Sequence, residues 1–304
     1  MSNILFTILF GIPQLFNFGN NNINNEAIYV ANNDNIVENE NSIKIPQKIN
    51  KSLGVKLKAK SALVLDRGSG EILFAKDSQK KMAMASITKI MTAIVALDSK
   101  INLDDTIIIE NDFVELEGAD IELAQGEKLK VKDLLYGTLI ASGNDAASAL
   151  ALNASGDLKI FIDQMNKKAK ELGLENTRFA NVSGLDMEGH YSTAEDLAKL
   201  ADYAFKNKQF IEVASTKEYD IVPESGNSRH ISSTNRLLLA AYPNLKVGKT
   251  GYTDNAGFCF LGLSENSKGN QVITVILKED LNGEQFQETK SLIDWTYKTY
   301  KWGE

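Results

Sequence analysis

The feature that most constrains this chain is an apolar run with a lysine inside it. Residues Met84–Leu97 read MASITKIMTAIVAL, with no Gly or Pro and with apolar side chains on nearly every helical face. A helix that is apolar all round packs inside a protein rather than on its surface. A lysine is almost never fully buried without a partner or a task, yet Lys89 lies in the first turn of this run. The sequence therefore predicts a buried helix that begins near Ser86 and carries an amine into the interior.

Ser86 and Lys89 stand three positions apart, which places them on one helical face with β-carbons roughly 5–6 Å apart. Burial disfavours the charged form of an amine, and a neutral amine beside a hydroxyl is a general base beside a nucleophile. A plainer interpretation is that Ser86 caps the helix and Lys89 extends its amine to water. Ser-x-x-Lys also occurs at Ser78–Lys81, in a polar run that has the composition of solvated surface. The Ser86 pair therefore needs support from elsewhere in the chain.

Composition narrows the classes of function. The 304 residues, 43% hydrophobic and 24% charged, suffice for one large domain or for two lobes that share a core. A net charge of −7 gives no electrostatic reason to expect nucleic-acid binding. The single cysteine, Cys259, excludes an internal disulfide and a multi-cysteine metal site. His190 and His230 are the only histidines, and both lie in polar, turn-like surroundings, which disfavours a histidine-based catalytic triad.

Residues 1–25 contain an apolar run, Ile4–Phe16, of the length found in signal-peptide cores and too short to cross a bilayer comfortably. No Lys or Arg precedes it and no clean small-x-small cleavage site follows. We therefore expect an imperfect or uncleaved export signal, with a packed or disordered apolar N-terminus as the alternative. Residues 26–55 are rich in Asn and poor in large apolar side chains, which is typical of a disordered linker. Membrane contact is expected only through the leader, if it stays uncleaved.

Residues 56–304 are expected to form the folded domain. Strand-like runs at both ends enclose a block of helical pattern, which predicts one α/β (α+β) domain with a sheet assembled from the two ends and an inserted helical lobe. A cleft between sheet and lobe is the natural position for a site. The predicted strands are Ser61–Leu65, Glu71–Ala75, Thr106–Ile109, Glu218–Val222, Leu245–Thr253, Gly257–Ser264 and Gln271–Lys278, and the predicted helices are Val131–Ala141, Asp145–Ala154, Leu158–Leu172, Thr193–Lys206 and Gly283–Tyr300.

Two further triplets stand at informative places. Ser142-Gly143-Asn144 falls between two predicted helices, whereas Ser225–Asn227 and Ser264–Asn266, which also fit Ser-x-Asn, lie in a polar turn and a polar loop. Lys249-Thr250-Gly251 occurs once, in the strand-like run Lys249–Thr253, where the glycine lets a substrate backbone come close. Each triplet alone is expected by chance in a chain of this length. The three in this order, on a helix start, an interhelical loop and a late strand, are not.

Together these motifs resemble the serine-type D-alanyl-D-alanine carboxypeptidases of the peptidase S11 family, the low-molecular-mass penicillin-binding proteins. The resemblance extends from about Ala62 to Trp295 and implies the DD-peptidase/β-lactamase-like fold, whose sheet is antiparallel. The segments that carry it are Ala85–Thr92, Asp133–Gly137, Ser142–Ala147, Gly189–Thr193 and Lys249–Thr253.

The resemblance implies a catalytic role for four side chains. Ser86 would attack the carbonyl of the penultimate D-alanine and form an acyl-enzyme, and Lys89 would take the serine proton. Ser142 would relay a proton to the departing D-alanine nitrogen. Asn144 would hydrogen-bond the substrate backbone and steady Lys89. Water would then release the shortened peptide, and neither a metal nor another cofactor is implied.

It also implies a substrate-binding role for the later motif. Lys249 would help keep the Lys89 amine neutral, and Lys249 with Thr250 would hold the terminal carboxylate. Gly251 would admit the substrate backbone. The backbone N–H groups of Ser86 and Tyr252 would form the oxyanion hole.

The partners implied by the resemblance are peptidoglycan stem peptides that end in D-Ala-D-Ala, with β-lactams as covalent inhibitors that acylate Ser86. The expected location is extracytoplasmic, either secreted or at the outer face of the cytoplasmic membrane. No nucleic acid is expected as a partner.

Three alternatives remain. Class A β-lactamases carry Ser-Asp-Asn and a glutamate that activates water, whereas this chain has Gly143 and no acid from Asn176 until Asp186. A DD-endopeptidase that cuts cross-links is not separated from a carboxypeptidase by the triplets. A non-catalytic peptidoglycan-binding protein would have a vestigial site, whereas every reactive residue is present here.

Overall fold

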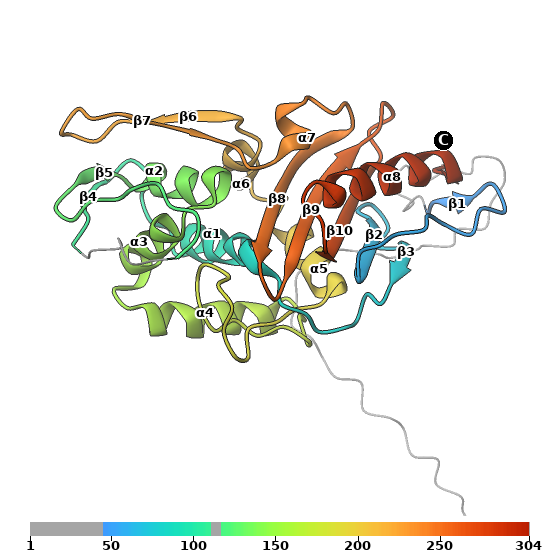
Figure 1. Cartoon of the computed structure of the whole chain (residues 1–304), viewed down its shortest axis with the longest axis horizontal. Helices are drawn as coiled ribbons and strands as arrows, with labels where there is room; N and C mark the ends of the chain where they lie inside the picture. The colour runs from blue at the N-terminus through green and yellow to red at the C-terminus, as the bar shows by residue number, and fades with distance from the viewer. Residues whose placement is uncertain (1–44, 111–116, 304) are drawn as a thin grey trace, which may run out of the picture. The chain divides into compact units, whose positions relative to one another are not determined.

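The computed structural model describes residues 45–110 and 117–303 of the chain. The leader predicted for residues 1–25, and the predicted linker as far as residue 44, lie outside the described residues. Figure 1 shows a sheet made from strands near both ends of the described chain, next to a lobe of helices from its middle. The predicted α/β architecture with a helical insertion is confirmed.

The central sheet has five strands, all paired antiparallel, in the order β3-β2-β10-β9-β8. Residues close to the N-terminal end supply two strands and residues close to the C-terminal end supply three, as predicted. The strands are β2 (Ser61–Asp66), β3 (Ile72–Lys76), β8 (Leu245–Thr253), β9 (Gly257–Glu265) and β10 (Gln271–Glu279).

Side-chain alternation along the strands gives the sheet two buried faces. Leu63 and Val275 belong to the core that the sheet shares with the helical lobe, whereas Val64 and Ile276 belong to a second core. Helix α8 (Glu284–Thr299) closes the second core, within one residue of the predicted bounds at each end. The sheet is therefore a middle layer, which agrees with its apolar strands.

The lobe is formed by helices and two small two-stranded sheets, β4-β5 and β6-β7. The elements of the lobe and of its connections to the sheet are β4 (Thr106–Ile108), β5 (Lys128–Lys130), α2 (Val131–Tyr136), α3 (Asn144–Ser155), α4 (Leu158–Glu171), α5 (Ala194–Ala204), α6 (Lys208–Ala214), β6 (Glu218–Ile221), β7 (Arg229–Ser232) and α7 (Arg236–Leu239). The predicted helix Val131–Ala141 is divided, because its second half is a π-helical turn, Gly137–Ala141. Sequence periodicity did not predict β5, α6, β7 or α7, since elements this short carry little periodic signal. Within residues 45–110 and 117–303, no helix is both long enough and apolar enough to span a membrane.

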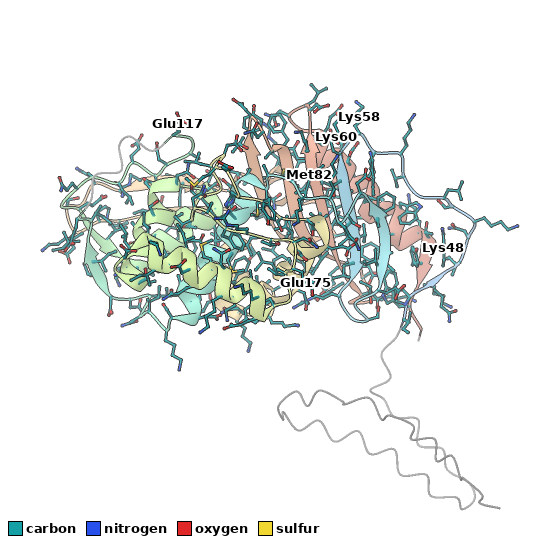
Figure 2. All side chains as sticks on the ribbon, turned by 90° about the horizontal axis from the view of Figure 1, so that it is seen from below. Lys48, Lys58, Lys60, Met82, Glu117 and Glu175 are labelled. Atoms are coloured by element: carbon teal, nitrogen blue, oxygen red, sulfur yellow. The ribbon has the colours of Figure 1, made fainter. Side chains whose placement is uncertain are left out.

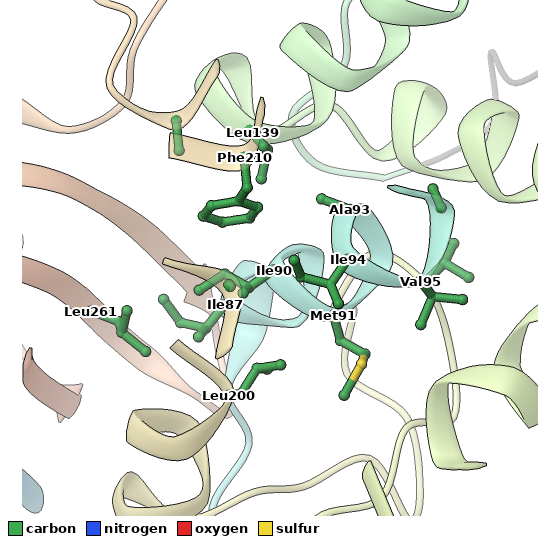
Figure 3. Packing of buried hydrophobic residues seen from close by; sticks show 14 of the residues in the cluster. Ile87, Ile90, Met91, Ala93, Ile94, Val95, Leu139, Leu200, Phe210 and Leu261 are labelled. Atoms are coloured by element: carbon green, nitrogen blue, oxygen red, sulfur yellow. The ribbon is translucent and has the colours of Figure 1, made fainter. Parts of the chain in front are cut away.

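Helix α1 (Lys89–Asp98) lies between the lobe and the sheet. A 3₁₀ turn, Ala85–Thr88, precedes it, so the α-helix begins three residues after the predicted start. Figure 3 shows the side chains of this turn and helix among those of Phe210 from the lobe and Leu261 from the sheet. The prediction of a helix buried on all sides is confirmed, because residues 89–96 are all buried.

The two ends of the described chain meet beside the sheet. Strand β1 (Gln47–Lys48) pairs antiparallel with β11 (Tyr300–Lys301). The Trp295 indole donates a hydrogen bond of 2.7 Å to Ser52 Oγ. Residues 47–52, which the sequence placed in the linker, therefore pack against the C-terminal segment.

Glu279, at the end of β10, is a buried carboxyl group. It is 1% exposed, and neither side-chain oxygen has a hydrogen-bond partner of good geometry among the described residues. Burial, and then the neighbouring carboxylates of Glu288 and Glu284, raise the pKa of Glu279 to about 8. The folded protein therefore retains a proton that the unfolded chain releases near pH 4.5. The stabilisation by this group is complete below pH 4.5 and is lost as the pH rises to about 8.

We predict that Glu279→Gln raises the melting temperature at pH 8 and changes it little at pH 5, because glutamine has the shape of the protonated acid and carries no charge. The gain should grow steadily between these two pH values. Thermal unfolding followed by circular dichroism at several pH values measures it, with the exposed Glu175→Gln as the matched control. A gain that does not depend on pH, or a loss at pH 8, contradicts the prediction.

Candidate active site

The 3₁₀ turn before α1 brings Ser86 and Lys89 together. Lys89 Nζ lies 2.9 Å from Ser86 Oγ. In a 3₁₀ turn the side chains at i and i+3 eclipse each other, so this turn aligns the pair more closely than an α-helical turn does. Ala85, directly before the serine, has a φ of +49°, which is uncommon for a residue other than glycine. The local backbone is thus held in a costly conformation at the point where the hydroxyl is presented.

Lys89 is completely buried, and three oxygen atoms surround its amine. Besides Ser86 Oγ, these are Asn144 Oδ1 at 2.6 Å and the carbonyl oxygen of Ser183 at 2.7 Å. Burial, and then the positive charge of Lys249, lower the pKa of the Lys89 amine well below its usual range, and Asp145 opposes the shift. The neutral amine is therefore strongly favoured relative to an exposed lysine.

The number of N–H groups on the Lys89 amine determines which of these contacts are donated and which is accepted. A neutral amine has two N–H groups and one lone pair, whereas an ammonium has three N–H groups and no acceptor. The Ser183 carbonyl can only accept, and Asn144 turns its oxygen to Lys89 because its amide nitrogen donates to the carbonyl of Glu117. In the neutral state both N–H groups are used by these two acceptors. The lone pair is then left for the Ser86 hydroxyl.

Ser142 and Lys249 form a second pair beside the first. Lys249 Nζ lies 2.7 Å from Ser142 Oγ and 3.1 Å from the carbonyl oxygen of Thr250. Ser142 ends the π-helical turn with a φ of +65°, and this left-handed residue directs the chain into α3. Burial lowers the pKa of Lys249 to about 7. The Lys249 amine, beside the Ser142 hydroxyl, can therefore gain or lose a proton close to neutral pH.

Two glycines let other segments approach the Ser86 turn closely. A β-carbon added at Gly251 of β8 would lie 3.0 Å from the backbone nitrogen of Ser86 and 3.1 Å from the carbonyl oxygen of Met84. A β-carbon at Gly184 would lie 2.0 Å from the carbonyl oxygen of Ala85. Neither position accepts a side chain without a shift of the turn. Strand β8 consequently borders the Ser86 N–H at Gly251, next to Tyr252.

A cleft of about 320 Å³ opens over these groups. Its walls include Ser86, Ser142, Asn144, Thr250, Gly251 and Tyr252. Lys249 is not at the wall, because it is buried and reaches Ser142 from behind. Among the described residues that line the cleft, Arg236 carries the one charged side chain, and none carries a carboxylate.

The structure thus gathers all of the sequence-predicted site residues in one region. Ser86, Lys89 and Asn144 form one hydrogen-bonded cluster. Ser142 and Lys249 form the neighbouring one. Thr250, Gly251 and Tyr252 contribute to the cleft wall from β8.

The competing motif copies lie elsewhere in other surroundings. Ser78 donates a hydrogen bond of 2.7 Å to Glu195, and it is buried rather than solvated as its polar neighbours suggested. Ser225 is exposed in the turn between β6 and β7, and Ser264 is buried within β9. None of the three lines the cleft.

Neither histidine acts on Ser86. His190 is buried, accepts a hydrogen bond from Ala180 N at Nδ1, and contacts Thr88 Oγ1 at 2.7 Å through Nε2. Burial lowers the pKa of His190 to about 4, so the ring is neutral and fixes the turn that precedes α1. His230 is exposed beside Asp220. The expectation that a histidine triad is disfavoured agrees with these positions.

Sequence reasoning missed two contributors to the site. The Ser183 carbonyl that accepts from Lys89 is a backbone group, which no motif of side chains can indicate. Arg236 begins α7, where Asn235 caps the helix by accepting from Leu238 N. An Asn-Arg pair shortly before the Lys-Thr-Gly triplet was the available signal, but a four-residue helix gives no pattern that would place it at the cleft.

Known proteins are similar to this chain in sequence and in fold. A family profile described as D-alanyl-D-alanine carboxypeptidase, Peptidase S11, matches residues 46–280. The D-alanyl-D-alanine carboxypeptidase DacF of Bacillus subtilis is 36% identical over 80% of this chain, and the chain spans 63% of that protein's length. A D-alanyl-D-alanine endopeptidase of Pseudomonas aeruginosa is 34% identical over 71% of this chain and 70% of its own length.

Solved structures agree with the sequence matches. The crystal structure of the Streptomyces K15 DD-transpeptidase is similar with a TM-score of 0.76 and 30% identity, covering 81% of this chain and all of that one. A D-alanyl-D-alanine carboxypeptidase from Mycobacterium tuberculosis has a TM-score of 0.74 at 28% identity. The profile match alone covers well over half of the chain. The chain therefore belongs to the peptidase S11 family, the D-alanyl-D-alanine carboxypeptidases.

Proposed function

We propose that this protein is a serine DD-carboxypeptidase that removes the terminal D-alanine from peptidoglycan stem peptides. The observation that carries the proposal is the contact of 2.9 Å between Ser86 Oγ and the fully buried Lys89 amine. An amine whose lone pair faces a hydroxyl is a general base in position for proton transfer. The proposed location is extracytoplasmic, because the proposed substrate is peptidoglycan.

In the proposed reaction Ser86 Oγ attacks the carbonyl of the penultimate D-alanine as Lys89 accepts its proton. The developing oxyanion is held by the backbone N–H groups of Ser86 and Tyr252, an arrangement supported by the close approach of β8 at Gly251. The bond to the last D-alanine breaks, and its nitrogen receives a proton through Ser142, which Lys249 can resupply. Water then attacks the acyl-enzyme and releases the shortened peptide and free Ser86.

Two cations have different positions relative to the terminal carboxylate of such a peptide. Lys249 is buried behind Ser142 and attracts the carboxylate through the pocket wall, whereas Arg236 exposes its guanidinium in the cleft. A guanidinium can bind a carboxylate with two parallel hydrogen bonds. Thr250, which is hydrogen-bonded to Thr234, presents a hydroxyl on the same wall. We propose that Arg236 and Thr250 bind the carboxylate and that Lys249 supplies charge behind them.

The same site would be acylated by a β-lactam and would release the adduct slowly. Class A β-lactamases achieve fast release with a glutamate that activates water, and no carboxylate lines the cleft among the described residues. Asp186, the first acid after Asn176, instead accepts hydrogen bonds from Thr253 Oγ1 and Asn255 N. These contacts support a penicillin-binding protein over a β-lactamase.

A DD-endopeptidase is the second candidate function. It is supported by two D-alanyl-D-alanine endopeptidases that are each 34% identical to this chain. Both reactions use the same acyl-enzyme chemistry and differ in the group that leaves. A non-catalytic peptidoglycan-binding role is disfavoured, because the acid–base pairs around Ser86 and Ser142 are complete.

The proposed nucleophile is tested by covalent labelling. We predict that fluorescent penicillin labels the wild-type protein and that the label persists, while Ser86→Ala is not labelled and releases no D-alanine from a pentapeptide stem. Ser78→Ala, the matched control from the other Ser-x-x-Lys motif, should retain both activities. Loss of label within seconds would identify a β-lactamase, and an unlabelled wild type would identify a binding protein. Release of peptide from cross-linked dimers, without D-alanine release from monomeric stems, would identify the endopeptidase.

The coupling between the two lysines is tested by pH dependence. Because the Lys249 charge lowers the pKa of Lys89, Lys249→Gln should raise the Lys89 pKa. In a plot of the penicillin acylation rate against pH, the rise on the acid side should then move to higher pH. This shift is expected even if the variant also changes the maximal rate. Stopped-flow or gel-based labelling across a pH series measures the position of this rise. An unchanged or downward-shifted rise would contradict the proposed coupling.

Carboxylate recognition by Arg236 is tested with paired substrates. Arg236→Gln should lower kcat/KM for a stem peptide with a free terminal carboxylate by about tenfold or more, since an ionic hydrogen bond contributes roughly 1.5–3 kcal/mol. The same variant should change hydrolysis of the C-terminal amide little. Equal losses for both substrates would show that Arg236 does not recognise the carboxylate.

A further inference from the structure

The segment that leads into β2, the first strand of the central sheet, is strongly basic. Residues 41–65 contain six lysines and no acidic residue, in a chain whose net charge is −7. Lys58 and Lys60 form ion pairs with Glu284 and Asp280. Three other lysines of the segment are exposed and have no ion-pair partner within the described ranges: these are Lys48, Lys51 and Lys56.

The C-terminal segment adds two lysines to the same end of the domain. Strand β1 pairs with β11, which places Lys301 opposite Gln47, and Asn50 donates a hydrogen bond to the Lys298 carbonyl oxygen. Lys298 and Lys301 are exposed, and neither has an ion-pair partner in the part of the chain that the structure describes. Five exposed lysines that have no ion-pair partner among the described residues therefore lie in these two adjoining segments.

Exposed apolar side chains alternate with these lysines. Ile45 is 60% exposed, Ile49 is 59% exposed and Leu53 is fully exposed. A single exposed apolar residue is ordinary, but three within nine residues, each followed by a lysine two or three positions later, are not. We call this surface, made of Ile45, Lys48, Ile49, Lys51, Leu53, Lys56, Lys298 and Lys301, the basic-apolar end.

The basic-apolar end is separate from the catalytic cleft. Figure 1 shows β1 and the loop after it at one end of the long axis, with the strand pairs β4-β5 and β6-β7 and helix α3 toward the other. Figure 2, turned by 90°, shows Lys48 at the same end of the domain. The residues that line the cleft include no member of the basic-apolar end. Contact through this surface would therefore leave the cleft open.

This surface is already ordered. Lys48 Nζ lies 5.9 Å from the centroid of the Trp295 ring in α8, and the Trp295 indole donates to Ser52 Oγ. Ile49 N donates to the carbonyl oxygen of Thr299. These contacts hold the loop against the C-terminal helix, so binding needs little further ordering of the chain.

We propose that the basic-apolar end docks this domain on an anionic lipid bilayer. Lysines attract anionic headgroups, and each lysine near the surface increases the affinity for the membrane roughly fivefold. The exposed Ile and Leu side chains can insert between the headgroups, where burial of apolar surface adds to the charge term. A soluble polyanion would use the lysines but gain nothing from Leu53 and its apolar neighbours, and for this reason the structure favours a lipid surface.

The test is co-sedimentation of the full chain with vesicles of phosphatidylcholine alone and of equal parts phosphatidylcholine and phosphatidylglycerol. The wild type should partition onto the anionic vesicles, and Lys48→Glu/Lys51→Glu should weaken this partitioning by about tenfold or more. The control Lys170→Glu/Lys208→Glu makes the same charge change at exposed lysines elsewhere and should bind as the wild type does. Equal binding by the wild type and Lys48→Glu/Lys51→Glu would overturn the proposal.

Leu53→Ser separates lipid from other polyanions, because it leaves every charge in place. It should weaken vesicle partitioning several-fold and leave elution from a heparin column unchanged. If Leu53→Ser has no effect on vesicles while the lysine variant loses both vesicle and heparin binding, the surface binds polyanions and the proposal of a lipid partner is wrong. Fluorescent penicillin labelling should be equal in all four proteins, which verifies that each variant is folded.

Discussion

The interior position of the Lys89 amine is the constraint on which the rest of this structure depends. A buried ammonium is costly, and the environment here supplies two acceptors and a hydroxyl but no carboxylate in direct contact. These partners suit a neutral amine. Asn144 and the Ser183 carbonyl accept the two N–H groups of the Lys89 amine, so the amine lone pair faces Ser86. The chemistry proposed for Ser86 follows from this arrangement.

Such an arrangement needs segments far apart in the sequence to meet within hydrogen-bonding distance. The sheet provides this, because strands from both ends of the domain lie next to one another and the helical lobe is inserted between them. Gly251 lets β8 approach the Ser86 turn, and Ser142, at the left-handed end of the π-helical turn, meets the Lys249 amine. The second lysine then acts on the first through its charge, so the two pairs form one electrostatic unit.

Much of this was predictable from the sequence, for identifiable reasons. Lys89 was found because an apolar run with one lysine is unusual, and Ser142 because its triplet fell between two helices in the expected order. The long strands and helices were found by their periodicity, and the predicted helix start at Thr193 is confirmed by its hydrogen bond from Asp196 N. The Ser183 carbonyl could not be found, since backbone acceptors leave no residue pattern. The 3₁₀ turn before α1 could not be found either, because a turn of four residues carries little periodic signal.

The protonation state of Lys89 is the most direct test of the proposed general-base mechanism. Side-chain nuclear magnetic resonance of protein with labelled lysines can follow the Lys89 ε-carbon and amine through a pH titration, with the Lys89→Arg variant used to assign the signal. The proposed mechanism predicts a Lys89 pKa well below the value of 10.5 for an exposed lysine, so that the amine is largely neutral under the conditions of catalysis. A Lys89 pKa near 10.5 would contradict it, because Ser86 would then have no base beside it.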